Sequence, residues 1–96
     1  MLTLDMLRRE KKSAILSLAG KHGARNIRVF GSVARGDNGD SSDVDFLVEF
    51  DEGRTLFDLI DFRLDLRELL GVDVDIVTPN SLRYMREPVL SEARPL

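Results

Sequence analysis

Two segments of the chain alternate between apolar and polar residues, and a segment of helical periodicity separates them. Residues 43–50 place four apolar side chains on one face and Asp43, Asp45 and Glu49 on the other, which is the period of a β-strand. Residues 72–77 alternate in the same way. Between them, leucines recur at helical spacing over about 16 residues. Two strands joined by such a helix pair in parallel through a right-handed crossover, so a β-α-β unit forms the centre of the predicted fold.

Local signals predict the elements before this unit. Thr3 is the predicted N-cap of a first helix, whose end is marked by Gly20 and Gly23, because threonine accepts a backbone N–H at a helix start and glycine tolerates the left-handed end. Residues 26–30 predict a short strand. The connection from this strand to residues 43–50 is short and rich in turn formers, which favours antiparallel pairing.

The central and last helices carry boundary signals of their own. Thr55 and Asp58 form a predicted capping box, and Gly71 stops the central helix. Closing helical pieces follow residue 81, and Pro88 is predicted at the first position of the last one. We therefore predict an α/β (α+β) fold in a single domain, with a small three-stranded mixed sheet and helices packed on one face.

Composition limits the compartment and the partners. The chain has 96 residues, which is the size of one domain, and a net charge of −3. An acidic balance argues against direct nucleic-acid binding, which favours a basic face. The absence of cysteine removes disulfides and thiolate chemistry. No apolar run approaches the roughly 18 residues of a membrane span, so we expect a cytoplasmic protein.

Carboxylates gather on the polar faces of two predicted strands. Asp43 and Asp45 share a face of one strand, and Asp73 and Asp75 share a face of the other. Like charges on neighbouring strands destabilise a sheet, and a divalent cation would reverse that cost. Alternating acids are also ordinary on a solvated face. Periodicity leaves both Asp73 and Asp75 open as the third acid of a metal site.

A second candidate feature is the turn at Gly31 and Ser32. Glycine permits close approach to the backbone, and a strand that runs into a helix start presents free N–H groups that suit a phosphate. The alternative is a simple turn in which Ser32 is an N-cap. His22, the only histidine, is interpreted as a surface loop residue, and Tyr84, the only tyrosine, as a packing residue.

The spacing of these two features resembles a known signature. Gly31-Ser32 followed after ten residues by Asp43-x-Asp45 is similar to the motif of the DNA polymerase beta-type nucleotidyltransferase superfamily. The surrounding string, residues 31–36 and 42–48, resembles its smallest members, the MntA-like minimal nucleotidyltransferases. The resemblance implies the nucleotidyltransferase fold. It also implies that Asp43, Asp45 and Asp75 are the catalytic, metal-binding carboxylates, whereas Asp73 matches no catalytic position.

The same resemblance implies the substrates and the partner. Gly31 and Ser32 would hold the distal phosphates of ATP, and Arg35 would contact phosphate or pair with Asp37 or another acid. The implied cofactor is Mg²⁺, with two ions expected. The implied reaction moves AMP to a hydroxyl group, which in this family is a tyrosine of a HEPN-domain toxin neutralised by the minimal nucleotidyltransferase as its antitoxin. The alternatives are a non-catalytic protein that neutralises its partner by occlusion, and transfer to a small molecule. A homo- or hetero-oligomer is compatible with either.

Overall fold

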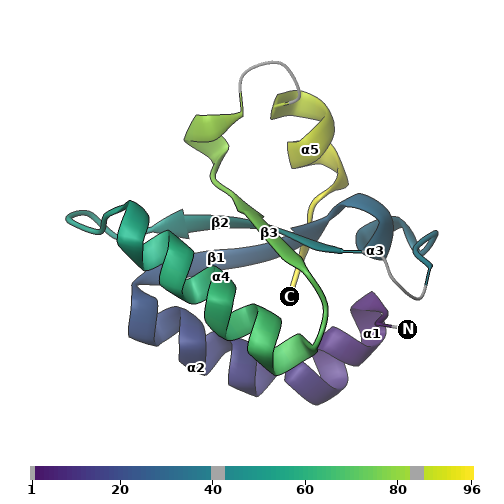
Figure 1. Cartoon of the computed structure of the whole chain (residues 1–96). Coiled ribbons are helices and arrows are strands. Elements are labelled where there is room, and N and C mark those ends of the chain that lie inside the picture. Colours follow the sequence, from purple (N-terminus) through teal and green to yellow (C-terminus); the bar gives the residue numbers. More distant parts are fainter. Residues whose placement is uncertain (1, 40–42, 83–85) are drawn as a thin grey trace.

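A mixed four-stranded sheet organises the chain (Figure 1). The computed structural model describes residues 2–39, 43–82 and 86–96, so Tyr84 lies outside the described residues. In chain order the elements are α1 (Leu4–Met6), the π-helical turn η1 (Leu7–Lys11), α2 (Lys12–His22), β1 (Ala24–Phe30), α3 (Gly31–Arg35), β2 (Val44–Phe50), α4 (Leu56–Leu70), β3 (Val74–Val77), the 3-10 turn η2 (Pro79–Ser81), α5 (Arg86–Glu92) and β4 (Arg94–Pro95).

The strand pairing confirms the predicted centre of the fold. The strand order is β3-β2-β1-β4. β2 pairs with β3 in parallel and with β1 antiparallel, as the connection lengths predict. The fourth strand was not predicted, because β4 contributes only Arg94 and Pro95 and pairs antiparallel with the edge of β1. Two residues are too few to show alternation, and proline is tolerated at a sheet edge.

The helix boundaries follow the predicted caps. The backbone N–H of Met6 donates to Oγ1 of Thr3 over 3.1 Å. Thr55 and Asp58 form the capping box of α4, and Gly71 ends that helix in the left-handed conformation. Gly23, not Gly20, ends α2, and Gly20 lies inside the helix. The first-position prediction for Pro88 is wrong, since α5 begins at Arg86; proline is tolerated there because N–H groups of a first turn need no helical partner.

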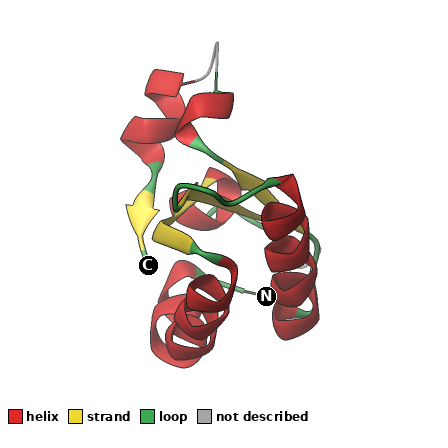
Figure 2. Cartoon of the chain, turned by 90° about the vertical axis from the view of Figure 1, so that its left-hand side faces the viewer, coloured by secondary structure: helices red, strands yellow, loops and turns green. Residues whose placement is uncertain are grey.

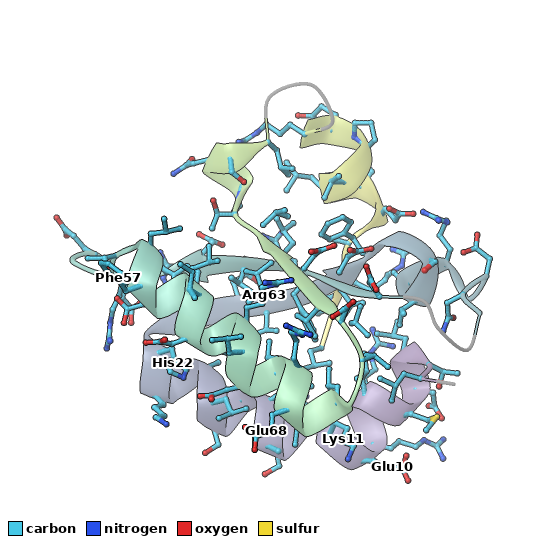
Figure 3. All side chains as sticks on the ribbon, in the orientation of Figure 1. Glu10, Lys11, His22, Phe57, Arg63 and Glu68 are labelled. Carbon is cyan, nitrogen blue, oxygen red and sulfur yellow. The ribbon has the colours of Figure 1, made fainter. Side chains whose placement is uncertain are left out.

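The hydrophobic core lies between the sheet and two helices. Val44, Phe46 and Val48 of β2 are fully buried and belong to one cluster with Phe62 and Leu66 of α4. α2 completes this layer with Ile15 and Ala19. Arg63 of α4 donates its Nε–H to the carbonyl of Val74 over 2.6 Å, which ties the helix to β3 (Figure 3). Each fully buried Phe or Leu contributes about 1.5–3 kcal/mol through the hydrophobic effect.

The other side of the sheet is covered in part by α5 and by the 3-10 turn η2, which contacts β2 (Figure 1). α5 lies opposite α2 and α4 (Figures 1 and 2). Leu47 of β2 and Val89 of α5 are buried but are not part of the core cluster. The predicted packing of helices on one face therefore describes α2 and α4, and α5 adds partial cover to the polar face. None of the described helices is long and apolar enough to cross a membrane.

His22 is a buried residue and not the surface loop residue that the sequence predicts. It is the last residue of α2 and is 8% exposed. Its Nε2 lies 2.6 Å from Oδ2 of Asp65 on α4, and its ring centre lies 5.9 Å from that of Phe62. Figure 3 shows His22 between the two helices. This pair joins α2 to α4, and the neighbouring glycines that favoured a loop lie within and after the helix.

Candidate active site

The strand register brings Asp45 and Asp75 side by side. Asp45 is in β2 and its Cα partners are Asp75 in β3 and Phe30 in β1. Asp43 directly precedes β2 and is exposed. The three acids predicted as a catalytic set therefore come from one end of two neighbouring parallel strands. Side chains two apart on a strand point to the same face, so Asp43 and Asp45 share the side of the sheet that faces away from α2 and α4.

Asp73 forms an ion pair with a residue of α4. It precedes β3, and its Oδ1 lies 3.0 Å from the guanidinium of Arg67 near the end of α4. The Asp73 side chain is 59% exposed in this ion pair. Of the two acids that periodicity left open, Asp75 is the one that lies beside Asp45.

Asp45 is the electrostatic centre of the site. Burial raises the pKa of Asp45 to about 6, and the charges of Asp75, Asp43 and Glu92 add to the shift. Arg35 opposes it. A carboxyl group in this environment is costly to ionise, because desolvation and like charges both disfavour the anion. A bound cation would remove that cost, which is the pattern expected at a functional site.

The donor set suits Mg²⁺ with substrate phosphates, not a closed protein cage. Within residues 2–39, 43–82 and 86–96, no three His, Cys, Asp or Glu side chains converge closely enough to hold a metal ion by themselves. Mg²⁺ is usually bound through one or two carboxylates together with phosphate oxygens and water. Asp43 and Asp45 supply carboxylates of that kind, so the residues present fit the ion that the sequence implies.

Gly31 lies against the Asp45 carboxylate. A Cβ atom at this position would lie 2.2 Å from Oδ2 of Asp45, which no side chain can accommodate without movement. The φ angle of Gly31 is +75°, in the left-handed region that favours glycine. Two independent constraints, a close approach and a backbone angle, therefore require glycine where β1 passes into α3. The sequence indicated a turn here, but only the structure shows which carboxylate approaches it.

Ser32 and Arg35 are presented by the short helix α3. The N-cap of α3 is Phe30, so Ser32 lies inside the helix and is not the N-cap that the alternative interpretation proposed. The guanidinium of Arg35 donates from Nε to Oδ2 of Asp37 over 3.0 Å and from Nη1 to Oε1 of Glu92. The hydrogen bond to Asp37 and that to Glu92 both raise the pKa of Arg35 above its ordinary value.

Glu92 is the residue of this site that sequence reasoning missed. Besides pairing with Arg35, its Oε2 accepts a hydrogen bond from the backbone N–H of Gly31 over 3.2 Å. Glu92 is separated from Gly31 by most of the chain, and it belongs to a short helix in which one acid looks like any other. No local pattern could have identified it.

Two surface grooves lie apart from the predicted catalytic carboxylates. One, of about 660 Å³, is lined by Leu64, Arg67, Glu68, Gly71, Val72 and Asp73. A second, of about 250 Å³, is lined by Arg25, Glu49, Phe50, Thr78, Pro79 and Asn80. Neither includes the predicted catalytic carboxylates. The position of the acids in the strand register, not the size of a groove, therefore identifies the candidate active site.

The fold and the acids together define a class of protein. Residues 9–96 match the family model described as the nucleotidyltransferase domain. Because this match spans most of the chain, the chain belongs to the nucleotidyltransferase domain family, as the resemblance predicted, and is a transferase of the nucleotidyl-transferring class.

Individual relatives agree with the family assignment. The chain is 40% identical over 83 residues to the protein adenylyltransferase MntA of Thermococcus cleftensis, covering 86% of this chain and 84% of the relative. It is 41% identical over 85 residues to MJ0435 of Methanocaldococcus jannaschii, provisionally named a protein adenylyltransferase, covering 88% and 91%. A solved structure described as a minimal nucleotidyltransferase has a TM-score of 0.85 and 52% identity, covering 99% of this chain and 97% of that one.

A more distant structure shares the fold. It is a toxin–antitoxin complex solved with AMP-PNP, with a TM-score of 0.75 and 22% identity over 88% of this chain and 71% of that chain. These comparisons confirm the predicted fold class, and the roles of individual residues remain predictions.

Proposed function

We propose that this chain is a Mg²⁺-dependent protein adenylyltransferase that moves AMP from ATP to a hydroxyl group of a partner toxin and so acts as an antitoxin. The observation that carries the proposal is the position of Asp45, whose carboxylate lies against Gly31 on one side and is paired in register with Asp75 on the other. The predicted phosphate turn and the predicted metal ligands thus meet at one carboxylate. The site needs a nucleotide phosphate to complete it, and ATP supplies one.

The proposed roles follow from this arrangement. Asp43 and Asp45 would hold Mg²⁺, with a second ion near Asp75. Mg²⁺ bound there would neutralise phosphate charge and lower the pKa of the attacking hydroxyl. Gly31, Ser32 and Arg35 bind and orient the distal phosphates, and Asp75 is the third carboxylate, close to where the hydroxyl loses its proton. The oxygen of the acceptor forms a bond to the α-phosphorus, and pyrophosphate leaves. Positioning and electrostatic stabilisation supply most of the rate.

The partner is proposed from relatives and from the resemblance. The relative from Thermococcus cleftensis is named a protein adenylyltransferase, and a structural neighbour is a toxin–antitoxin complex. The resemblance points to a tyrosine of a HEPN-domain toxin as the acceptor. We infer a cytoplasmic location from the proposed use of ATP as the substrate.

A second candidate function is neutralisation by occlusion. The N-terminal half of α4 exposes large apolar side chains, among them Leu56, which is 68% exposed, and Phe57, which is 77% exposed. Figure 3 shows Phe57 near the start of α4. Ile60 and Leu64 continue this exposed apolar surface along the helix. Exposed apolar patches mark interaction surfaces, so binding alone could neutralise a partner.

Transfer of label from α-³²P-ATP to the co-expressed toxin, in the presence of Mg²⁺, tests the proposal. We expect labelling by the wild type and a loss of at least about 100-fold in Asp45→Asn, because the metal-binding charge is removed. Asp73→Asn is the matched control, since it removes an equal charge two residues from Asp75 in an exposed ion pair. If Asp45→Asn still neutralises the toxin within an intact complex, occlusion replaces catalysis as the function.

A further inference from the structure

The C-terminal helix is joined to the predicted phosphate-binding residues by one side chain. Glu92, the last residue of α5, accepts the Gly31 backbone N–H with Oε2 and the Arg35 guanidinium with Oε1. α5 also packs against α3, the helix that carries Ser32 and Arg35 (Figure 1). A residue near the end of the chain thus contacts both groups to which the proposed function assigns the distal phosphates of ATP.

Both carboxylate oxygens of Glu92 are engaged in these bonds. The Glu92 side chain is 24% exposed and faces a guanidinium and a backbone donor. Both bonds are formed to an ionised carboxylate, and the one from the guanidinium is a charge-assisted pair of the stronger kind. Glu92 therefore contacts the predicted phosphate-binding residues, whereas Asp45 and Asp75 are register partners on neighbouring strands.

The residues that follow Glu92 are fixed to the rest of the fold. Ala93 donates to the carbonyl of Val89 over 2.9 Å, and the next two residues pair with β1 as β4. Leu96 is buried in the core cluster, and its N–H donates to the carbonyl of Ile27 over 3.1 Å. The backbone next to Glu92 is therefore fixed to the sheet and the core, which keeps its side chain within reach of Arg35 and Gly31.

Arg35 retains capacity for a further anion. A guanidinium has five N–H donors. Asp37 accepts from Nε and Glu92 accepts from Nη1. Two carboxylates bonded to two different nitrogens of the guanidinium restrict its rotamers before the nucleotide binds, which reduces the entropy lost on binding.

We propose that Glu92 is a positioning residue for the phosphate-binding site: it fixes the Arg35 guanidinium in the orientation that receives the distal phosphates of a nucleoside triphosphate, while its hydrogen bond from the Gly31 N–H holds the carboxylate in place. This inference rests on the proposed function. It extends that function by making the C-terminal helix part of the active site through Arg35.

Glu92→Gln tests the proposal with little change in size. The glutamine amide places a donor against either Arg35 or the Gly31 N–H, so one charge-assisted bond is lost. We expect affinity for Mg-ATP and for inorganic tripolyphosphate to fall about five- to tenfold, as measured by isothermal titration calorimetry. Glu87→Gln is the matched control, because Glu87 is an exposed acid of the same helix and the charge change is the same.

A double-mutant cycle separates positioning from a purely structural role. If Glu92 acts through Arg35, Glu92→Gln costs no further affinity in an Arg35→Gln background. A loss that persists in full in that background overturns the inference, as does wild-type affinity in Glu92→Gln. Tighter binding by Glu92→Gln also overturns it and identifies Glu92 as a competitor of phosphate. If the wild type itself binds neither Mg-ATP nor tripolyphosphate, the proposed function fails and the inference fails with it.

Discussion

The pKa values of two carboxylates, one on each side of the sheet, are shifted in opposite directions. On the helical side, Asp65 accepts a hydrogen bond from the buried ring of His22, which lowers the pKa of Asp65. On the other side, burial and the neighbouring acids raise the pKa of Asp45 to about 6. One carboxylate is satisfied by its protein partner, and the other has partners of its own sign. The charge of Asp65 therefore stabilises the fold, whereas the charge of Asp45 carries an electrostatic cost that a bound cation would offset.

The largest expected effect tests the crowding at Asp45. Gly31→Ala places a Cβ atom against Oδ2 of Asp45 and strains a residue with a φ of +75°. We expect the free energy of unfolding to fall by about 2 kcal/mol, as measured by urea denaturation, and nucleotide binding to be lost.

Gly20→Ala is the matched control for this variant. Gly20 lies inside α2, and a Cβ atom there would meet nothing within 4 Å. An alanine in a helix interior is expected to stabilise the protein by about 0.5–1 kcal/mol. Equal effects of the two substitutions would show that the acid side is no more crowded than an exposed helix.

The next effect tests the electrostatic cost of Asp45. Because the folded-state pKa of Asp45 is raised to about 6, the stability that its protonation contributes is full below the ordinary aspartate pKa and is lost as pH rises through about 6. At pH 7.5 without divalent metal, we expect Asp45→Asn to raise the free energy of unfolding by about 1–2 kcal/mol, after discounting for partial solvent screening.

The measurement is chemical denaturation between pH 4 and 8, with and without Mg²⁺ and ATP. Wild type is expected to gain stability when both ligands are present, and Asp45→Asn is expected not to. Asp73→Asn, whose carboxylate is exposed and paired with Arg67, is the control and should follow the wild type. A variant at Asp45 that is less stable than wild type at pH 7.5 would contradict the comparison.

The smallest expected effect concerns Asp65. A lowered pKa means that the carboxylate contributes stability above its ordinary pKa and loses it as pH falls through the folded-state value. Asp65→Asn should therefore flatten the acidic limb of the stability curve below about pH 4 and lower stability at neutral pH. Asp61→Asn, an exposed acid of the same helix, should leave that limb unchanged. The two carboxylates thus have opposite predicted pH dependence, and thermal unfolding across pH measures it.

Local signals predicted much of the fold because they act over a few residues. Thr3 and Thr55 cap helices through their own neighbours, and the alternation of residues 43–50 assigns each side chain to a face. The connection lengths also predicted which strands pair in parallel. Local signals did not reveal β4, because a two-residue strand has no period. They also predicted a surface loop position for His22, because its partner Asp65 is distant in the sequence.

The sequence by itself determined the class of chemistry: a glycine-serine turn, two acids of one strand and an acid on the next predicted strand. Tertiary structure decided which groups meet. The parallel register placed Asp75 beside Asp45 while Arg67 holds Asp73, and the return of the chain through α5 brought Glu92 to Gly31 and Arg35. The physical reason is range: alternation and capping depend on neighbours in the chain, whereas a pKa shift or an ion pair depends on distances in space, which only the folded chain sets.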